Sequence, residues 1–219
     1  MPTEPSDTGR ELRDQVKAWS QVGSARDFEE GALAPTLADI LSAEHDLIKR
    51  VIAVLDRESG RIGEGQDVDA VFIDRVVDFI HTYAERVHHG KEEEVIFREL
   101  DSKSLSPEHR QMMERLVREH VEMRHLAEDL VEARERYIEG DEEALRTVED
   151  TIGRLSDLYP DHFRTEEETF FPAAQSYVED SKGGILEAMR LHDRAMIHEK
   201  YGSLVDGLEA VTETWSVSE

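Results

Sequence analysis

Apolar residues recur at spacings of three and four along most of the chain, which is the pattern of amphipathic α-helices. A first long helix is predicted to begin near Pro35, because proline suits the first helical turn. Its apolar positions are Leu37, Ile40, Leu41, Leu47, Ile48, Val51, Ile52 and Leu55. Further helices are predicted over about 68–100, 107–139 and 141–178, and a last helical stretch over about 183–215. No segment has the alternation of a β-strand, so the sequence predicts an all-α fold.

Turn and capping residues separate the predicted helices. A Gly-rich segment, 60–67, follows the first helix, and Ser106 with Pro107 is a typical helix start. Gly140 is predicted to end the third helix. Four helices of this length would bury one another's apolar faces as a bundle over residues 35–180.

Extensions are expected at both ends of the bundle. Residues 1–34 are predicted to be flexible, apart from a short amphipathic helix with Leu12, Val16 and Trp19 on its apolar face. Residues 181–219 are predicted to form a C-terminal helical extension that packs on the bundle.

An internal repeat relates the first two long helices to the next two. The dipeptide Glu44-His45 in the first helix has a counterpart in Glu119-His120 in the third. The second and fourth helices each carry His, three residues, and then Glu-Glu-Glu with an apolar pair, starting at His88 and at His162. The interval from His45 to His88 is 43 residues, and that from His120 to His162 is 42. The repeated unit is therefore an antiparallel helix pair, and its duplication brings the four motifs to the same depth.

Histidine and glutamate four residues apart lie on the same face of a helix, so both can ligate one metal ion. Imidazole with carboxylate suits iron, manganese or zinc. The candidate metal ligands are His45, His88, Glu92, His120, His162 and Glu166. Six such groups exceed the needs of one ion but suit two ions bridged by two carboxylates. Without an ion, these groups would be costly to bury.

The second helix offers two overlapping candidate pairs. Within a helix of regular period, His88 and Glu92 align with the apolar Ile80, Ala84 and Val95. By the same period, His89 and Glu93 align with Thr82, Glu85 and Arg86, which is typical of a solvent-facing side. The register therefore favours His88 and Glu92 as ligands and places His89 in solvent.

The combination of His45, His88-x-x-x-Glu92, His120 and His162-x-x-x-Glu166 resembles the hemerythrin-like (HHE) cation-binding domain family. The resemblance covers residues 35–180 and implies an up-down four-helix bundle there. It implies two non-haem iron ions with an oxo or hydroxo bridge, with Glu92 and Glu166 as bridging ligands and an open position for dioxygen. From residue chemistry alone, manganese or zinc stays an alternative to iron.

Many members of that family have a fifth histidine, four residues after the one in the third helix. Here Arg124 stands at that position, and His125 is turned away from the face of His120. His198, in line with apolar positions of the last helix, is the best candidate for the missing ligand. His192 and His81 are weaker candidates.

Composition narrows the choice of partners. The chain has 51 acidic and 26 basic residues and a formal net charge of −25, which argues against binding nucleic acid or anionic membranes. The absence of cysteine excludes thiolate ligands and disulfides. No run of 18 apolar residues and no signal peptide is present, so a cytoplasmic protein is expected. An exposed last helix would also allow a homodimer.

The function that the sequence predicts is binding of dioxygen or a related small molecule, such as nitric oxide or hydrogen peroxide, at a di-iron centre. One alternative is a di-iron enzyme that acts on peroxide or nitric oxide. Another is a ferritin-like iron oxidase, whose Glu-x-x-His motif occurs at Glu85 to His88 and at Glu122 to His125. A sensing module and a metal-free bundle are further alternatives.

Overall fold

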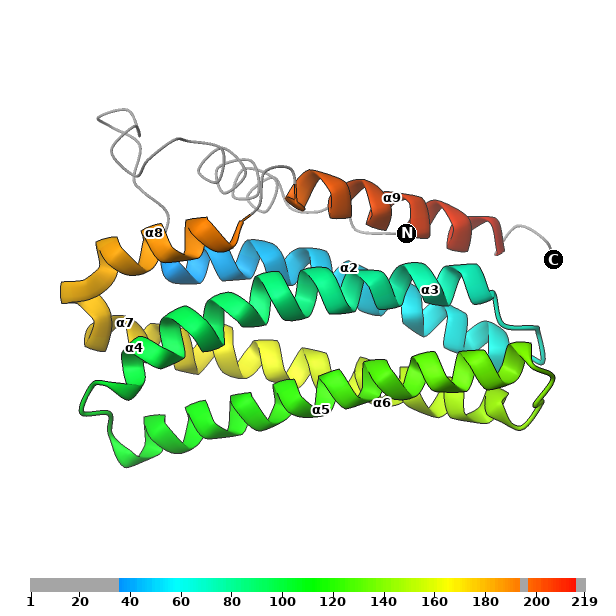
Figure 1. The fold of residues 1–219 in the computed structure, drawn as a ribbon, viewed down its shortest axis with the longest axis horizontal. Coiled ribbons are helices and arrows are strands. Elements are labelled where there is room, and N and C mark those ends of the chain that lie inside the picture. The colour runs from blue at the N-terminus through cyan, green and yellow to red at the C-terminus, as the bar shows by residue number, and fades with distance from the viewer. Residues whose placement is uncertain (1–35, 194–196, 216–219) are drawn as a thin grey trace.

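The computed structural model describes residues 36–193 and 197–215, except for the side chains of residues 199, 214 and 215. The predicted helix with Leu12, Val16 and Trp19 and the predicted helix start at Pro35 lie outside these residues. In the described ranges the chain is almost entirely helical and contains no strand (Figure 1). The prediction of an all-α fold is therefore confirmed.

Four long helical segments run alternately up and down (Figure 1). The first is α2 (Leu37–Gly63), and the third is α5 (Pro107–Ile138). The second consists of α3 (Ala70–Phe79), the π-helical stretches η1 (Ile80–His89) and η2 (Glu92–Phe97), and α4 (Arg98–Asp101). The fourth consists of α6 (Ala144–Thr165), the π-helical η3 (Glu166–Phe170) and α7 (Phe171–Val178). Because α5 packs against both α3 and α6, and α6 against α2, the four segments close into a bundle.

Local chemistry sets the helix ends. The side chain of Thr36 accepts a hydrogen bond from the backbone N–H of Asp39, whose carboxylate accepts one from the N–H of Thr36, so α2 begins with a capping box. Ser106 caps α5 by accepting from the N–H of His109. Gly140 follows α5 with a φ of +99°, a left-handed conformation that costs glycine little.

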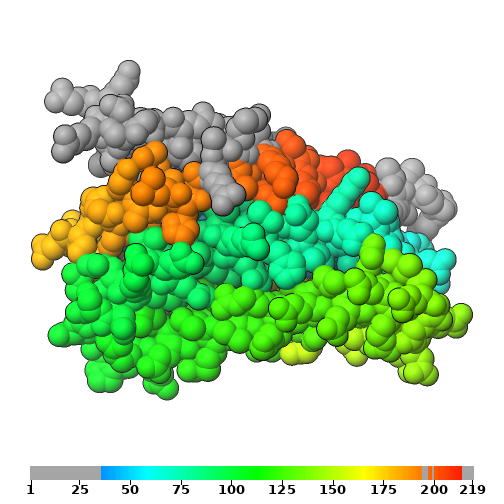
Figure 2. Space-filling model, viewed as in Figure 1, coloured from blue at the N-terminus to red at the C-terminus, as the bar shows by residue number. Residues whose placement is uncertain are grey.

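The remaining helices lie along one side of the bundle. They are the 3₁₀ turn η4 (Glu179–Ser181), α8 (Lys182–His192) and α9 (Ile197–Trp215). Helix α9 packs against α2 and α3, and α8 packs against η2. Figure 2 shows both of them, orange and red, lying along the second helical segment. Within the described residues, no helix is long and apolar enough to cross a membrane.

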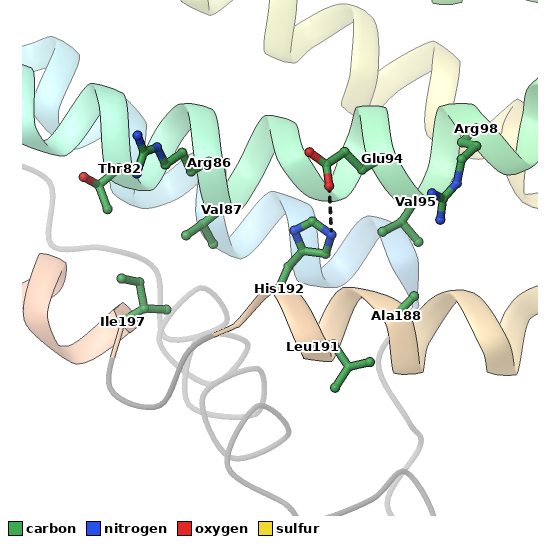
Figure 3. A pocket seen from close by; sticks show the side chains of 10 residues that line it. All are labelled: Thr82, Arg86, Val87, Glu94, Val95, Arg98, Ala188, Leu191, His192 and Ile197. Carbon is green, nitrogen blue, oxygen red and sulfur yellow. Dashed lines mark ion pairs between the residues drawn. The ribbon is translucent and has the colours of Figure 1, made fainter.

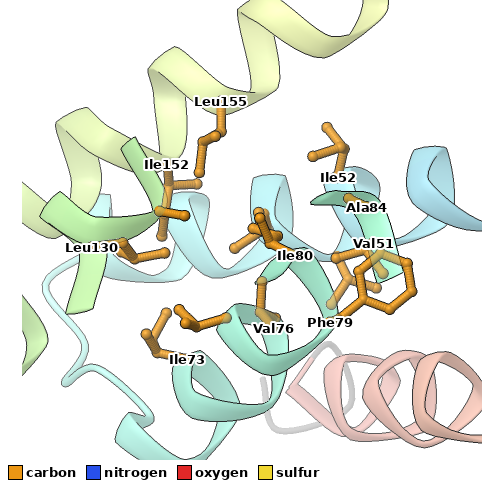
Figure 4. Close-up of a cluster of buried hydrophobic side chains, with 14 of the residues drawn as sticks. Val51, Ile52, Ile73, Val76, Phe79, Ile80, Ala84, Leu130, Ile152 and Leu155 are labelled. Carbon is orange, nitrogen blue, oxygen red and sulfur yellow. The ribbon is translucent and has the colours of Figure 1, made fainter. Parts of the chain in front are cut away.

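The apolar core consists of two separate clusters. One includes Val51, Val76 and Ile152 and fills the half of the bundle nearer the α2–α3 and α5–α6 turns (Figure 4). The other includes Leu41, Leu116 and Phe170 and lies at the opposite end. Buried histidine and glutamate side chains separate the two clusters, so the apolar clusters enclose a polar layer from both ends of the bundle.

Candidate metal centre

The structure brings the six ligand candidates from the bundle's sequence motifs together in this polar layer. All six side chains are fully buried: His45, His88, Glu92, His120, His162 and Glu166. They come from all four long segments, so the layer spans the bundle. A glutamate side chain is almost never fully buried unless it is paired or binds a metal.

The four histidines form two pairs. Nε2 of His45 lies 2.9 Å from Nε2 of His88, and Nε2 of His120 lies 3.1 Å from Nε2 of His162. One pair comes from the first repeat and the other from the second, as the duplication predicts. The ring nitrogens of each pair therefore converge on one point.

Two carboxylates lie between the pairs. Glu166 has one oxygen 3.2 Å from Nε2 of His45 and the other 3.1 Å from Nε2 of His162. Glu92 likewise has one oxygen 3.5 Å from Nε2 of His88 and the other 3.3 Å from Nε2 of His120. None of the four carboxylate oxygens has a well-formed hydrogen bond within the described part of the chain. Each carboxylate therefore reaches both histidine pairs while it remains unsatisfied.

A second set of carboxylates orients the imidazoles. The Nδ1 atoms of the four histidines lie 2.8–3.0 Å from carboxylate oxygens: His45 with Glu167, His88 with Glu44, His120 with Glu93, and His162 with Glu119. A carboxylate can only accept, so in the neutral imidazole the proton is on Nδ1 and the lone pair is on Nε2. Histidines that bind metals are commonly held in this way.

Each outer carboxylate also has its own cation. Glu167 pairs with Lys49 at 2.7 Å, Glu119 with Arg115 at 2.6 Å, and Glu93 with Arg124 at 3.2 Å, while Glu44 pairs with the buried Lys91. These pairs compensate the outer negative charges. The inner carboxylates, Glu92 and Glu166, have no Lys or Arg partner among the described residues, so the uncompensated negative charge is concentrated in the middle.

The protein shifts the pKa values of the inner groups accordingly. Burial acts to lower the pKa of His45, but the carboxylates of Glu166 and Glu167 outweigh it and raise that pKa to about 9. Burial also acts to lower the pKa of His120 and that of His162, but the surrounding carboxylates outweigh it and raise both pKa values. For Glu166, burial acts to raise the pKa, but the adjacent histidines hold it well below its ordinary value. The layer is therefore built to keep carboxylates charged and to attract cations.

The prediction that His89 faces solvent is wrong. Its side chain is 1 % exposed, and its ring stacks on that of His120 with centroids 3.9 Å apart. Neither ring nitrogen has a hydrogen-bond partner among the described residues. The prediction assumed a helix of regular period, whereas His88 and His89 lie at the end of the π-helical stretch η1. Wider π turns rotate successive side chains differently, so both histidines turn inward.

The donor atoms form two groups that each fit one ion. His45, His88, Glu92 and Glu166 each offer an atom within 4.8 Å of the others, and His89, Glu92, His120 and His162 do the same. Two nitrogens bound to one ion at about 2.1 Å and at right angles lie about 3.0 Å apart, which matches the separations within the two histidine pairs. Glu92 belongs to both groups, so the residues present fit a pair of metal ions.

His198 lies outside both groups. Its Nδ1 lies 2.9 Å from the hydroxyl of Tyr83, and its Nε2 lies 3.2 Å from Asp193. It is grouped instead with Glu44 and Asp193, where the ammonium of Lys91 already pairs with both carboxylates. The structure thus places His198 beside an outer carboxylate and places His89 at the position of a fifth imidazole.

The other sequence candidates lie away from the two groups. His192 lies 3.7 Å from Glu94 and is partly exposed, and His81 is also partly exposed. Glu122 and His125, one of the two Glu-x-x-His motifs, are both exposed. The four outer carboxylates were not identified from sequence, although two of them directly precede a ligand candidate and two directly follow one.

Comparison with known families agrees with this geometry. The model of the Hemerythrin HHE cation binding domain matches residues 36–174, and a second match covers residues 115–219. The two matches overlap, as expected when the second helix pair repeats the first. No curated protein and no solved structure matches the chain.

Proposed function

Because this chain belongs to the hemerythrin HHE cation-binding domain family, we propose that it holds two iron ions and binds dioxygen or a related small molecule there. The observation that carries the proposal is the pair of inner carboxylates. Glu92 and Glu166 are fully buried, lack well-formed hydrogen bonds within the described residues, and each reach both histidine pairs. Two cations would compensate both charges at once.

The ligands divide between the two ions. One ion would be held by His45 and His88, and the other by His89, His120 and His162, with Glu92 and Glu166 bridging. The second ion would thus have one imidazole more than the first. This unequal division would leave the first ion with more room for an added molecule.

The metal is iron in this proposal. A set rich in imidazole with two carboxylates suits iron, manganese and zinc, and three imidazoles with two carboxylates on the second ion would exceed the four ligands of tetrahedral zinc. A pair of reduced iron ions supplies the electrons needed to hold dioxygen reversibly. The protein residues fix the imidazoles through their outer carboxylates and exclude bulk water through the two apolar clusters.

An iron oxidase of the ferritin type is less well supported. That function uses Glu-x-x-His motifs that project into the bundle. Here both Glu122 and His125 are exposed, so one of the two motifs contributes nothing to the layer.

The test is metal content together with the absorption spectrum of protein purified without chelator. Two irons per chain are expected, with near-ultraviolet bands that bleach on anaerobic reduction and return when dioxygen is added. The variant His45→Ala should lose these bands, and the exposed His125→Ala should retain them. One zinc per chain, or no metal in folded protein, would contradict the proposal. Bands that return only after slow, irreversible turnover would indicate an enzyme acting on peroxide or nitric oxide.

A further inference from the structure

A pocket of about 380 Å³ lies between α2 and α6. Its rim carries charged side chains, among them those of Lys49 and Glu167, and its wall includes the exposed Ala53. The floor is apolar and consists of Ile52, Tyr159 and Phe163, all of them buried. The pocket is thus a polar-rimmed hollow that leads to aromatic rings.

The floor of this pocket is in contact with the metal ligands. The ring of Phe163 stacks on that of His45, with centroids 4.1 Å apart and planes 27° apart. Tyr159 lies beside Phe163 with ring centroids 5.4 Å apart. One aromatic ring therefore separates the pocket from a ligand of the candidate centre.

Tyr159 carries a polar atom that nothing in the described structure satisfies. Its side chain is fully buried, and its hydroxyl has no hydrogen-bond partner among the described residues. A buried tyrosine hydroxyl usually has one. Burial, together with the charge of Glu85, raises its pKa, so the hydroxyl keeps its proton. Tyr159 precedes His162 by three residues, so it lies on the same face of α6 as that ligand candidate.

A larger pocket on another face is closed off from the centre. It measures about 460 Å³ and lies between the second helical segment and α8–α9, with Val87, Ala188 and His192 among its lining residues (Figure 3). On this side Nδ1 of His88 is covered by Glu44, which pairs with the buried Lys91. A molecule moving inward from this pocket would have to part a buried ion pair, which is costly.

We propose that a small uncharged molecule reaches the centre through the pocket between α2 and α6, passing Phe163 and accepting a hydrogen bond from Tyr159. The proposal rests on the function proposed above. An apolar floor suits a diatomic gas, and a net charge of −25 disfavours anions near the surface.

The kinetic test fills the pocket at an exposed position. Ala53→Trp is expected to lower both the association and the dissociation rate of nitric oxide with the reduced, iron-loaded protein by about 10-fold, since a barrier increase of about 1.4 kcal/mol gives that change. The dissociation constant should stay the same, because a route affects both directions equally. Ala188→Trp, which fills the other pocket, is the matched control and should leave both rates within about twofold. Unchanged rates in Ala53→Trp, or slowing in Ala188→Trp alone, would overturn the route.

Removing one hydroxyl tests the donor. Tyr159→Phe keeps the ring and is expected to raise the dissociation rate of nitric oxide about fivefold, the value of one net hydrogen bond. The association rate should change little. An unchanged dissociation rate would remove Tyr159 from the proposal.

A third measurement needs no metal. In protein stripped of metal, dissolved xenon should shift the methyl NMR signals of Ile52 in a saturable way, and Ala53→Trp should abolish that shift. If xenon causes no shift at Ile52, the proposed route is wrong, whether or not the protein binds iron. If instead the proposed function is wrong, the protein will bind neither iron nor nitric oxide.

Discussion

Nε2 of His45 lies 2.9 Å from Nε2 of His88, although each imidazole already presents its Nδ1 to a carboxylate. If both protons are on Nδ1, two lone pairs face one another at this distance. Such a contact is stable only when a proton or a metal ion lies between the nitrogens. The same relationship recurs between His120 and His162 at 3.1 Å. The layer is therefore organised around two cation positions, and the predictions below test its members one at a time.

The bridging role proposed for the inner carboxylates predicts a loss of both ions together. Glu92→Gln and Glu166→Gln should each lower metal content from two ions per chain to fewer than one, because each side chain reaches both histidine pairs. Elemental analysis after gel filtration measures this. The exposed Glu168→Gln is the control and should retain two ions. Loss of a single ion in both variants would show that neither carboxylate bridges.

His89 is expected to matter for one ion of the two. His89→Ala should lower the affinity for the second ion about 10-fold or more. Loss of a residue that only orients a ligand already lowers metal affinity about 10- to 100-fold. The first ion, whose proposed ligands are His45 and His88, should bind as before. Titration of metal-free protein with Fe²⁺ distinguishes the two steps. His125→Ala, an exposed neighbour of the third helix, should leave both steps unchanged. If both Fe²⁺ binding steps are unaffected in His89→Ala, this histidine only packs in the core and does not bind metal.

The outer carboxylates should tune affinity without binding metal. Glu119→Gln keeps the shape of the side chain but weakens its interaction with Nδ1 of His162, which lies 2.9 Å away. Metal affinity should fall by about 10- to 100-fold with the stoichiometry unchanged. Competition with a chelator of known affinity measures the fall. The nearby Glu122→Gln, on an exposed face, should behave as the parent protein, and an equal fall there would point to general surface charge instead.

The raised histidine pKa values predict how metal-free protein responds to pH. The pKa of His45 is about 9 in the folded protein against 6.5 in the unfolded chain. Its stabilising contribution is therefore complete below pH 6.5 and is lost as the pH rises through 9, by about 3 kcal/mol for this group. Urea unfolding of metal-free protein between pH 6 and 9.5 should show a falling free energy of unfolding.

Metal-loaded protein provides the control for that experiment. A metal ion takes the place of the proton on each ligand, so its free energy of unfolding should not fall over the same pH range. Metal-free stability that is constant from pH 6 to 9.5 would show that the buried histidines are neutral without metal.

Local sequence features determined most of the fold. The spacing of apolar residues was enough to place the helices, and capping by Ser106 and the left-handed Gly140 set the ends of α5 as predicted. These features act within one or two turns of chain, so they can be recognised without knowledge of the packing. The internal repeat also located the candidate metal centre, because equal intervals along paired helices bring their histidine and glutamate motifs to the same depth in the bundle. All six bundle residues chosen in this way are buried in a single layer.

The tertiary structure alone decided how that layer is completed. His89 is inside because the second helix becomes π-helical at the ligands, and that change depends on backbone hydrogen bonds that residue types do not specify. Each outer carboxylate contacts a histidine on a different helical segment, as Glu44 does with His88 and Glu167 with His45. His198 contacts Asp193 and Tyr83 because the packing of α9 against the bundle decides which side chains meet. Periodicity gives the direction of a side chain on its own helix, whereas its partners on other helices follow only from how those helices pack.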